Sequence, residues 1–221
     1  MILPTSKYWP LKPGTYCDYS AGLITGYWHP GTMELDIWTR VPDPNQGIFR
    51  RNVIAHPHVE SPRVSIVHSN PPVVATFDMD WTGAYRLDQI LWDDGTLPAY
   101  IGEYGAGQSI SGPPDPVMTV NPVAGERFST TAMGFQFDSV TGKVSRVSLP
   151  VNYGTVATGL VWWDYTGCVR TALCERPGQS GSIVYNYVFA PGIGMIDFWW
   201  GAVDANNRVS GNAWKIEGHG P

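Results

Sequence analysis

Two aspartates separated by one residue form the first candidate for chemistry in the sequence. Asp78 and Asp80 lie in the segment Val73–Asp80, whose β-branched and aromatic residues are typical of a strand. Alternate residues of a strand face the same side, roughly 6.5–7 Å apart, and glycoside hydrolases hold two carboxyl groups about 5–9 Å apart across the scissile bond. Acids are also common on solvated strand faces, so a catalytic pair is one alternative and a solvated face is the other.

Two further acids lie beside pairs of tryptophans. Asp164 directly follows the Trp162–Trp163 pair, and Asp197 lies two residues before the Trp199–Trp200 pair. These two acids are alternatives to Asp78 and Asp80 as the catalytic carboxyl groups of a carbohydrate hydrolase. The sequence contains neither a complete nucleophile elbow nor a complete dinucleotide-binding motif. We therefore expect a chain without catalytic activity that uses no cofactor.

Three histidines are the candidate ligands of a metal ion. His56 and His58 would share one face of an extended segment, and His68 lies ten residues beyond His58. This inventory resembles the His-x-His sites of small β-barrels, but Pro57 disfavours a position inside a sheet. Histidines of a surface loop are the simpler interpretation, so these three residues are an alternative rather than a predicted metal centre.

The cysteines are too few for a disulfide-stabilised scaffold, and their number, three, is odd. Cys168 and Cys174 flank the segment Val169–Leu173, which could form the tip of a hairpin. The two thiols could then form a disulfide in an oxidising compartment, and free thiols are the other interpretation. Cys17 is expected to be a small buried hydrophobic residue.

Aromatic residues make up 13% of the chain, with 10 tryptophans and 11 tyrosines. Adjacent residues of a strand point to opposite faces, so one member of each Trp-Trp pair should leave the core if only one face of the sheet is covered. Outward rings would contact a sugar or a neighbouring subunit, and a sheet covered on both faces is the alternative. The contact residues that we predict are Trp81, Trp162, Trp163, Trp199 and Trp200.

The composition argues against several classes of protein. The formal net charge is −5 and only 15% of residues are charged, whereas a nucleic-acid surface needs clustered basic residues. The hydrophobic content of 43% is too high for a disordered chain. No run of 18 apolar residues could span a membrane as a helix. The apolar start ends at Pro4, and we expect no signal peptide in this chain.

The elements that would position these residues are strands. Short alternating or β-branched segments recur about every 8–15 residues, and Gly, Pro, Asn and Asp separate them. The 25 glycines and 19 prolines leave little room for long helices. The pattern predicts an all-β fold, an antiparallel sandwich or barrel of roughly twelve strands with little helix. The clearest segments are Met33–Thr39, Arg63–His68, Val73–Asp80, Lys143–Leu149, Thr155–Trp163, Ser182–Phe189, Met195–Trp200 and Val209–Ile216.

We expect a single β-rich domain over residues 1–221, because the composition does not change along the chain. A long Gly/Pro-rich loop is expected near residues 105–116. The segment Asp204–Asn207 should form the turn between the last two strands. The segment Tyr85–Trp92 should be a strand, with a short helix as the alternative.

Two motifs near the ends of the chain suggest a relationship to known proteins. The segment Tyr8–Tyr19 contains an aromatic-Pro-Leu-x-x-Gly opening, and Tyr187–Ile196 contains Ala-Pro-Gly-x-Gly before an apolar strand. In these motifs the chain resembles a loose group of bacterial exported β-rich lipoprotein-type domains. The resemblance implies an all-β fold and no catalytic residues. The chain departs from the group in having no lipobox cysteine before Tyr8.

Three hypotheses for the function follow. The first is a non-enzymatic structural or binding protein of a virion-surface or extracellular assembly, in which aromatic and arginine residues contact neighbouring subunits or further copies of the chain. The excess of arginine over lysine, 10 residues against 4, supports this first hypothesis. The second is a secreted glycan-binding module, and the third is a carbohydrate-active hydrolase that uses the acids named above. We expect no nucleic-acid partner under any of them.

Overall fold

The computed structural model describes residues 8, 15–44, 48–54, 63–67, 73–79, 85–92, 109–110, 122–138 and 143–221. Side-chain surroundings are described for residues 8, 15–44, 48, 122–129 and 150–221. Within these ranges the regular structure is all strand, and no helix occurs.

The strands pair in antiparallel fashion, which confirms the all-β prediction. They are β1 (Tyr16–His29), β2 (Glu34–Pro42), β3 (Phe49–Ile54), β4 (Arg63–Val67), β5 (Val73–Met79), β6 (Tyr85–Trp92), β7 (Ser109–Ile110), β8 (Arg127–Asp138), β9 (Lys143–Trp162), β10 (Tyr165–Glu175), β11 (Ile183–Ala190), β12 (Gly194–Val203) and β13 (Arg208–Gly220).

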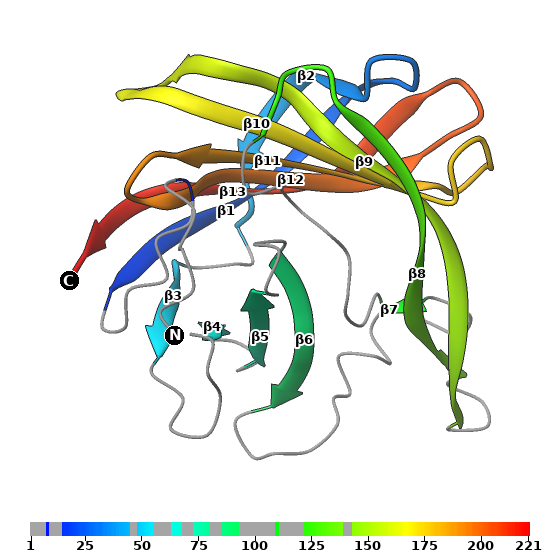
Figure 1. Ribbon diagram of the computed structural model, residues 1–221, viewed down its shortest axis with the longest axis horizontal. Helices are drawn as coiled ribbons and strands as arrows, with labels where there is room; N and C mark the ends of the chain where they lie inside the picture. The colour runs from blue at the N-terminus through cyan, green and yellow to red at the C-terminus, as the bar shows by residue number, and fades with distance from the viewer. Residues whose placement is uncertain are drawn as a thin grey trace.

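The described strands belong to one sheet whose order is an open path, β6-β5-β4-β3-β1-β13-β12-β11-β10-β9-β8-β7. The long strand β1 has two partners on its other edge: its first residues, Tyr16–Tyr19, pair with β3, and Gly22–His29 pair with β2. Figure 1 shows β10–β13 with β1 and β2 in the upper part of the molecule, β3–β6 below them, and β8 and β9 running from the upper part down the right-hand side. The path does not close, so the finer prediction of a sandwich or barrel is not confirmed.

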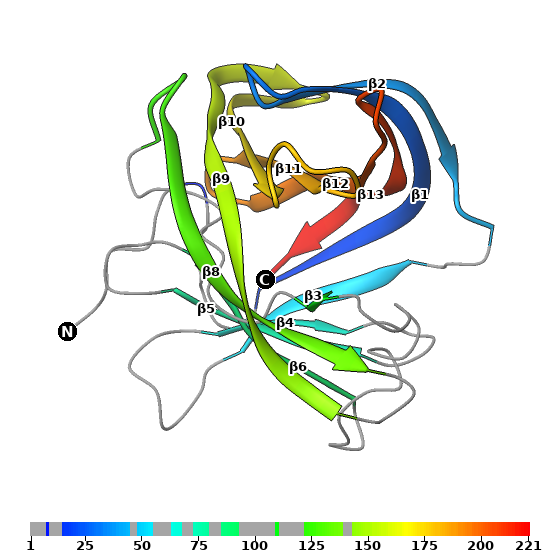
Figure 2. The same cartoon turned by 90° about the vertical axis from the view of Figure 1, so that its right-hand side faces the viewer.

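The sheet bends because several strands carry irregularities. The register shifts at Asp18/Tyr19 in the β1–β13 pair, at Thr25/Gly26 in the β1–β2 pair and at Val188/Phe189 in the β11–β12 pair. Such bulges bend a strand and increase its twist. Figure 2 shows the consequence, since β9–β13, β1 and β2 curve around a common interior.

Side chains connect the β1–β2 hairpin to β8 and β10, strands with which β2 forms no backbone ladder in the described residues. On β10, Arg170 donates from Nη2 to the backbone oxygen of Leu35 in β2, over 2.8 Å. At the start of β8, Arg127 donates from Nη2 to the backbone oxygen of Thr32, over 2.5 Å. These bonds attach the β1–β2 hairpin to β8 and β10 across the interior.

Buried and exposed side chains alternate along the outer strand β1, whereas residues of both faces are buried along the first part of the central strand β12. In β1 the buried positions alternate, and they include Cys17, Tyr19 and Ile24. In β12 every residue from Gly194 to Trp199 is buried. Both faces of the sheet are therefore covered at β12, which is the alternative that the sequence left open for the tryptophan pairs.

Several local expectations can be compared with the structure. The turn at Asp204–Asn207 is confirmed: Asp204 accepts backbone N–H groups at Oδ1 from Asn206 and Arg208, each over 2.8 Å. The segment Tyr85–Trp92 is strand β6, so its helical alternative is wrong. The loop expected at 105–116 lies outside the described residues except for β7.

Candidate functional site

Asp197 lies near the start of β12, and four hydrogen bonds hold its carboxylate. Arg40 of β2 donates from Nη1 to both oxygens, over 2.8 Å to Oδ1 and 3.0 Å to Oδ2. The indole Nε1 of Trp162 donates to Oδ2 over 3.1 Å, and the backbone N–H of Phe198 donates to Oδ1 over 3.1 Å. The acid is therefore joined to two segments that are distant in the chain, β2 through Arg40 and the end of β9 through Trp162.

The pKa of Asp197 is raised to about 6, because burial disfavours the charged carboxylate more than its donors stabilise it. Arg40 and the other donors act in the opposite direction and lower the pKa. Asp197 is only 1% exposed. The carboxylate is therefore an internal partner of Arg40 and is not open to a substrate in this conformation.

Trp162 and Trp199 stack over this acid in the interior of the curved sheet. Their ring centroids are 5.7 Å apart at an angle of 13°, and the guanidinium of Arg170 lies 5.3 Å from the centroid of Trp199. Arg170 also donates from Nε to Oδ1 of Asn186 over 3.1 Å. Trp199 is fully buried, so the prediction that it is a contact residue is wrong: it is part of the core.

Trp163 lies beside this interior cluster but faces outward. It has a positive φ of 50°, and its side chain is 41% exposed. The guanidinium of Arg40 lies 5.7 Å from its ring centroid, and Nζ of Lys215 lies 5.1 Å from it. Cations at these distances are attracted by the negative face of the indole. Trp163 is thus an exposed aromatic side chain that two cations hold in place.

Trp200 belongs to a second aromatic cluster, on the opposite face of β12 from Trp199. Its ring centroid lies 4.9 Å from that of Phe198 and 5.2 Å from that of Trp214, and Phe198 also stacks on Tyr187 at 4.7 Å. These cross-strand contacts join β11, β12 and β13. Trp200 is half-buried, so its main role in the described structure is packing.

The remaining predicted site residues are not brought to this cluster by the described structure. Asp164 is exposed in the turn between β9 and β10. Asp78 lies on β5, where it pairs along the backbone with Arg63. The other candidates fall outside the described residues; they are Asp80, Trp81, His56, His58 and His68.

The proposed disulfide is a second correction. Cys168 and Cys174 lie on the same strand, β10, with no hairpin tip between them. Six strand residues span about 20 Å, whereas the Cα atoms of a disulfide lie less than about 7 Å apart. Both residues are buried free thiols, and burial raises the pKa of the Cys174 thiol to about 11.

In the described ranges, no three His, Cys, Asp or Glu side chains are placed together to hold a metal ion. The same part of the chain contains no helix with the length and apolar character needed to cross a membrane.

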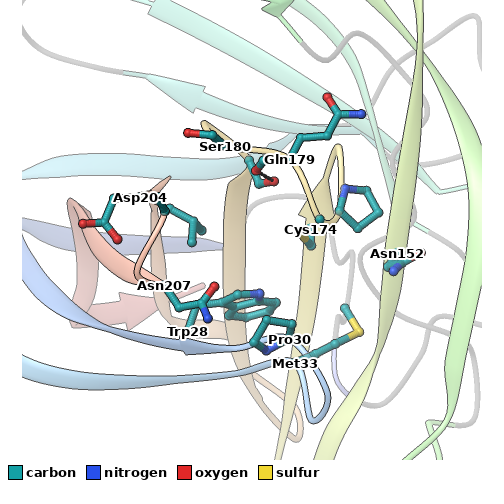
Figure 3. A pocket seen from close by; sticks show the side chains of 14 residues that line it. Trp28, Pro30, Met33, Asn152, Cys174, Gln179, Ser180, Asp204 and Asn207 are labelled. Carbon is teal, nitrogen blue, oxygen red and sulfur yellow. Dashed lines mark hydrogen bonds between the residues drawn. The ribbon is translucent and has the colours of Figure 1, made fainter.

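A hollow of about 290 Å³ lies at the other end of the strands, away from Asp197. The turns that follow β1, β10 and β12 surround it, and Figure 3 shows their side chains directed around a common space. The sequence predicted one of these turns, Asp204–Asn207, but assigned no function to it. No local signal indicates the hollow, because the three turns are far apart in the chain.

A comparison with solved structures finds a chain of similar fold, a crystal structure described as that of a putative lipoprotein from Parabacteroides distasonis ATCC 8503. The two share 15% sequence identity with a TM-score of 0.51, over 98% of this chain and 99% of the other. At this identity the likeness concerns the fold alone, and it agrees with the β-rich lipoprotein-type fold that the terminal motifs resemble. No family model and no curated protein matches the sequence.

Proposed function

We propose that the chain is a non-enzymatic structural or binding protein of an extracellular or virion-surface assembly, and that it contacts neighbouring subunits through exposed aromatic and arginine side chains. The observation that carries the proposal is Trp163, a large aromatic residue exposed at a defined position between Arg40 and Lys215. Tryptophan and arginine are enriched at the centres of protein interfaces.

The fixed position of Trp163 supports a contact role. Arg40 is held by its two bonds to the buried carboxylate of Asp197, and Trp163 follows Trp162, which also donates to that carboxylate. An anchor that is already ordered loses little conformational entropy when a partner covers it. The buried network therefore presents the exposed ring in one orientation.

The surroundings of Asp197 and Asp164 favour a binding protein over a hydrolase that would use these two acids. A glycosidase needs two carboxyl groups that face a sugar across a short gap. Asp197 is buried and paired with Arg40, while Asp164 is exposed in a turn. The structural neighbour is described as a lipoprotein, and this description is compatible with the surface location that we propose.

Light scattering coupled to size exclusion tests the proposal. We expect the purified chain to form a defined oligomer, and Trp163→Ser to shift it toward the monomer. Phe128→Ser is the matched control, since Phe128 is 40% exposed on a different strand, and this variant should leave the mass unchanged. A wild-type chain that stays monomeric at every concentration would contradict contacts between copies of the chain.

A second candidate function is glycan binding on the outer face of the β1–β2 hairpin. Trp38 is 58% exposed and stacks with Tyr27, with ring centroids 6.3 Å apart at 21°. The neighbouring pair Thr25 and Thr39 supplies hydroxyl groups. Trp38→Ser should abolish retention on an immobilised glycan that retains the wild type, and the absence of retention across a broad glycan array would reject this function.

A further inference from the structure

The hollow near the β10–β11 turn has an apolar floor. Trp28 at the end of β1, Met33 in the β1–β2 turn and Cys174 near the end of β10 are buried residues that line it. The backbone N–H of Trp28 donates to the backbone oxygen of Asn207 over 2.8 Å. This bond fixes the β1 end of the floor against the β12–β13 turn.

The rim of the hollow is polar. Asn152, Gln179, Ser180 and Asn207 line it, and Figure 3 shows their side chains around the opening. Amide and hydroxyl groups can each donate and accept hydrogen bonds. Asn152 accepts a bond at Oδ1 from the hydroxyl of Ser129 over 2.8 Å, so its NH₂ group is the part that remains for a ligand.

The three turns around the hollow are conformationally constrained. Of the four described non-glycine residues with positive φ, three lie in these turns, Met33 at 56°, Arg176 at 50° and Asn207 at 59°. The hydroxyl of Ser182 lies 2.6 Å from the backbone oxygens of both Arg176 and Gln179. Positive φ is uncommon for non-glycine residues, and such residues occur in turns and at ligand sites.

The charges define the chemical class of the ligand. Among the described lining residues there is no Lys, Arg or His, and the one charged side chain is Asp204. Asp204 already accepts two backbone N–H groups of its own turn at Oδ1. An anion would find no cation here, whereas hydroxyl groups can donate to the carboxylate and bond to the amides.

We infer that this hollow binds one neutral sugar residue, such as the terminal residue of a glycan. A pyranose ring has an apolar face that can pack on Pro30 and Pro177, the more exposed prolines of the lining, and a ring of hydroxyl groups that can reach the polar rim. The volume of about 290 Å³ lies just below the range of about 300–1,000 Å³ that is typical of ligand pockets, which fits a single sugar residue rather than a chain. This site is separate from the exposed tryptophans of the proposed function.

The test uses the full chain and the methyl glycosides of glucose, galactose, mannose and N-acetylglucosamine, with saturation-transfer NMR to detect binding and calorimetry to measure it. We expect at least one of these neutral glycosides to bind, and glucuronate, which is anionic, to bind more weakly. If none of the four binds at about 10 mM, a concentration that detects dissociation constants in the millimolar range, the inference is overturned.

Two variants locate the binding. Gln179→Ala removes an exposed rim amide, and Asn207→Gly removes another while glycine adopts the same positive φ. Each should weaken binding roughly tenfold, the effect of one lost hydrogen bond. Asn206→Ala, in the same turn but outside the lining, is the control and should bind as the wild type.

Binding that survives in both variants but disappears in Trp38→Ser would place the sugar on the outer aromatic face instead and would overturn the inference. The mass of the oligomer is measured independently of sugar binding. Failure of this site and failure of the proposed subunit contacts are therefore distinguishable.

Discussion

Asp197 is the residue whose environment differs most from what its sequence neighbours suggested. Its position before a tryptophan pair made it an alternative catalytic acid, but the structure buries it against Arg40 and Trp162. The pKa of about 6 reflects the cost of burying a carboxylate, which the ion pair only partly offsets. This balance leads to a measurable dependence of stability on pH.

Between pH 4 and pH 6 the folded chain binds more protons than the unfolded chain at Asp197, because the folded pKa of about 6 lies above the ordinary value of 3.8. The contribution of this group to the free energy of unfolding therefore falls as pH rises through that window, by about 3 kcal/mol in total. Asp197→Asn keeps one oxygen, which can still accept from Trp162 and Arg40, replaces the other oxygen with an NH₂ donor, and cannot ionise.

Urea denaturation of the wild type and of Asp197→Asn at pH 4, 5, 6 and 7 checks this prediction. The free energy of unfolding of the variant minus that of the wild type should increase as pH rises from 4. This difference should level off above pH 6. A constant difference across the whole range would show that Asp197 does not titrate in this window.

The cysteines give a second prediction at the residue scale. Cys17, Cys168 and Cys174 are buried free thiols, and burial raises the pKa of Cys168 and of Cys174. Thiolate is the reactive form, so the native chain should not react with a chromogenic thiol reagent. After unfolding in urea without reductant, three thiols per chain should react; one reactive thiol would indicate a disulfide.

At the scale of elements, the contact between β12 and β13 depends on two glycines that face each other. Gly201 pairs with Gly211, and a Cβ added at Gly211 would collide with the backbone of Trp200 and of Gly201. The two strands can therefore keep their pairing at this point only without side chains.

We expect Gly211→Ala to lower the free energy of unfolding by about 1–3 kcal/mol, the usual cost of forcing extra volume into a packed site. Gly218→Ala is the matched control on the same strand, because a Cβ there meets no atom within 4 Å. Urea denaturation at constant pH measures both. Equal stability of the two variants would contradict the close approach of the strands.

At the scale of the whole molecule, the curved sheet is held together by arginine side chains where its backbone ladder is interrupted. Arg127 attaches the start of β8 to the β1–β2 turn through Thr32, and Arg170 attaches β10 to β2 through Leu35. Because such a side-chain bond stands where the strands make no backbone bonds, its loss should make the β1–β2 hairpin separate more readily from the rest of the sheet.

We expect Arg127→Ala to accelerate amide hydrogen exchange in the hairpin residues 30–42 and to leave β12 unchanged. The described bonds of the Arg127 side chain reach Thr32 in the hairpin and Thr155 in β9 but no residue of β12. Arg208→Ala is the control, since Arg208 is an exposed arginine of β13 whose backbone makes its described hydrogen bonds. Exchange measured by mass spectrometry on peptides checks the result. Unchanged exchange in residues 30–42 would mean that Arg127 does not hold the hairpin.

Local sequence patterns predicted many of the strands and one of the turns. Alternation predicted Met33–Thr39 and Met195–Trp200 close to the observed β2 and β12, and the acidic-amide turn predicted the β12–β13 connection. These features depend on backbone conformation and on neighbours a few residues away, which a short segment already contains. The hairpin expected between Cys168 and Cys174 was wrong because its segment pairs as a strand on both sides.

The face of the sheet that each aromatic residue occupies, and the residue that pairs with Asp197, depend on contacts between distant parts of the chain. Arg40 lies 157 residues from Asp197 in the chain, and no local pattern specifies that pair. It depends on the order of the strands, on the bulges that bend them and on coverage of both faces at β12. Trp199 is consequently buried and Trp163 exposed, because long-range pairing and curvature, rather than local alternation, place a ring inside or outside the sheet.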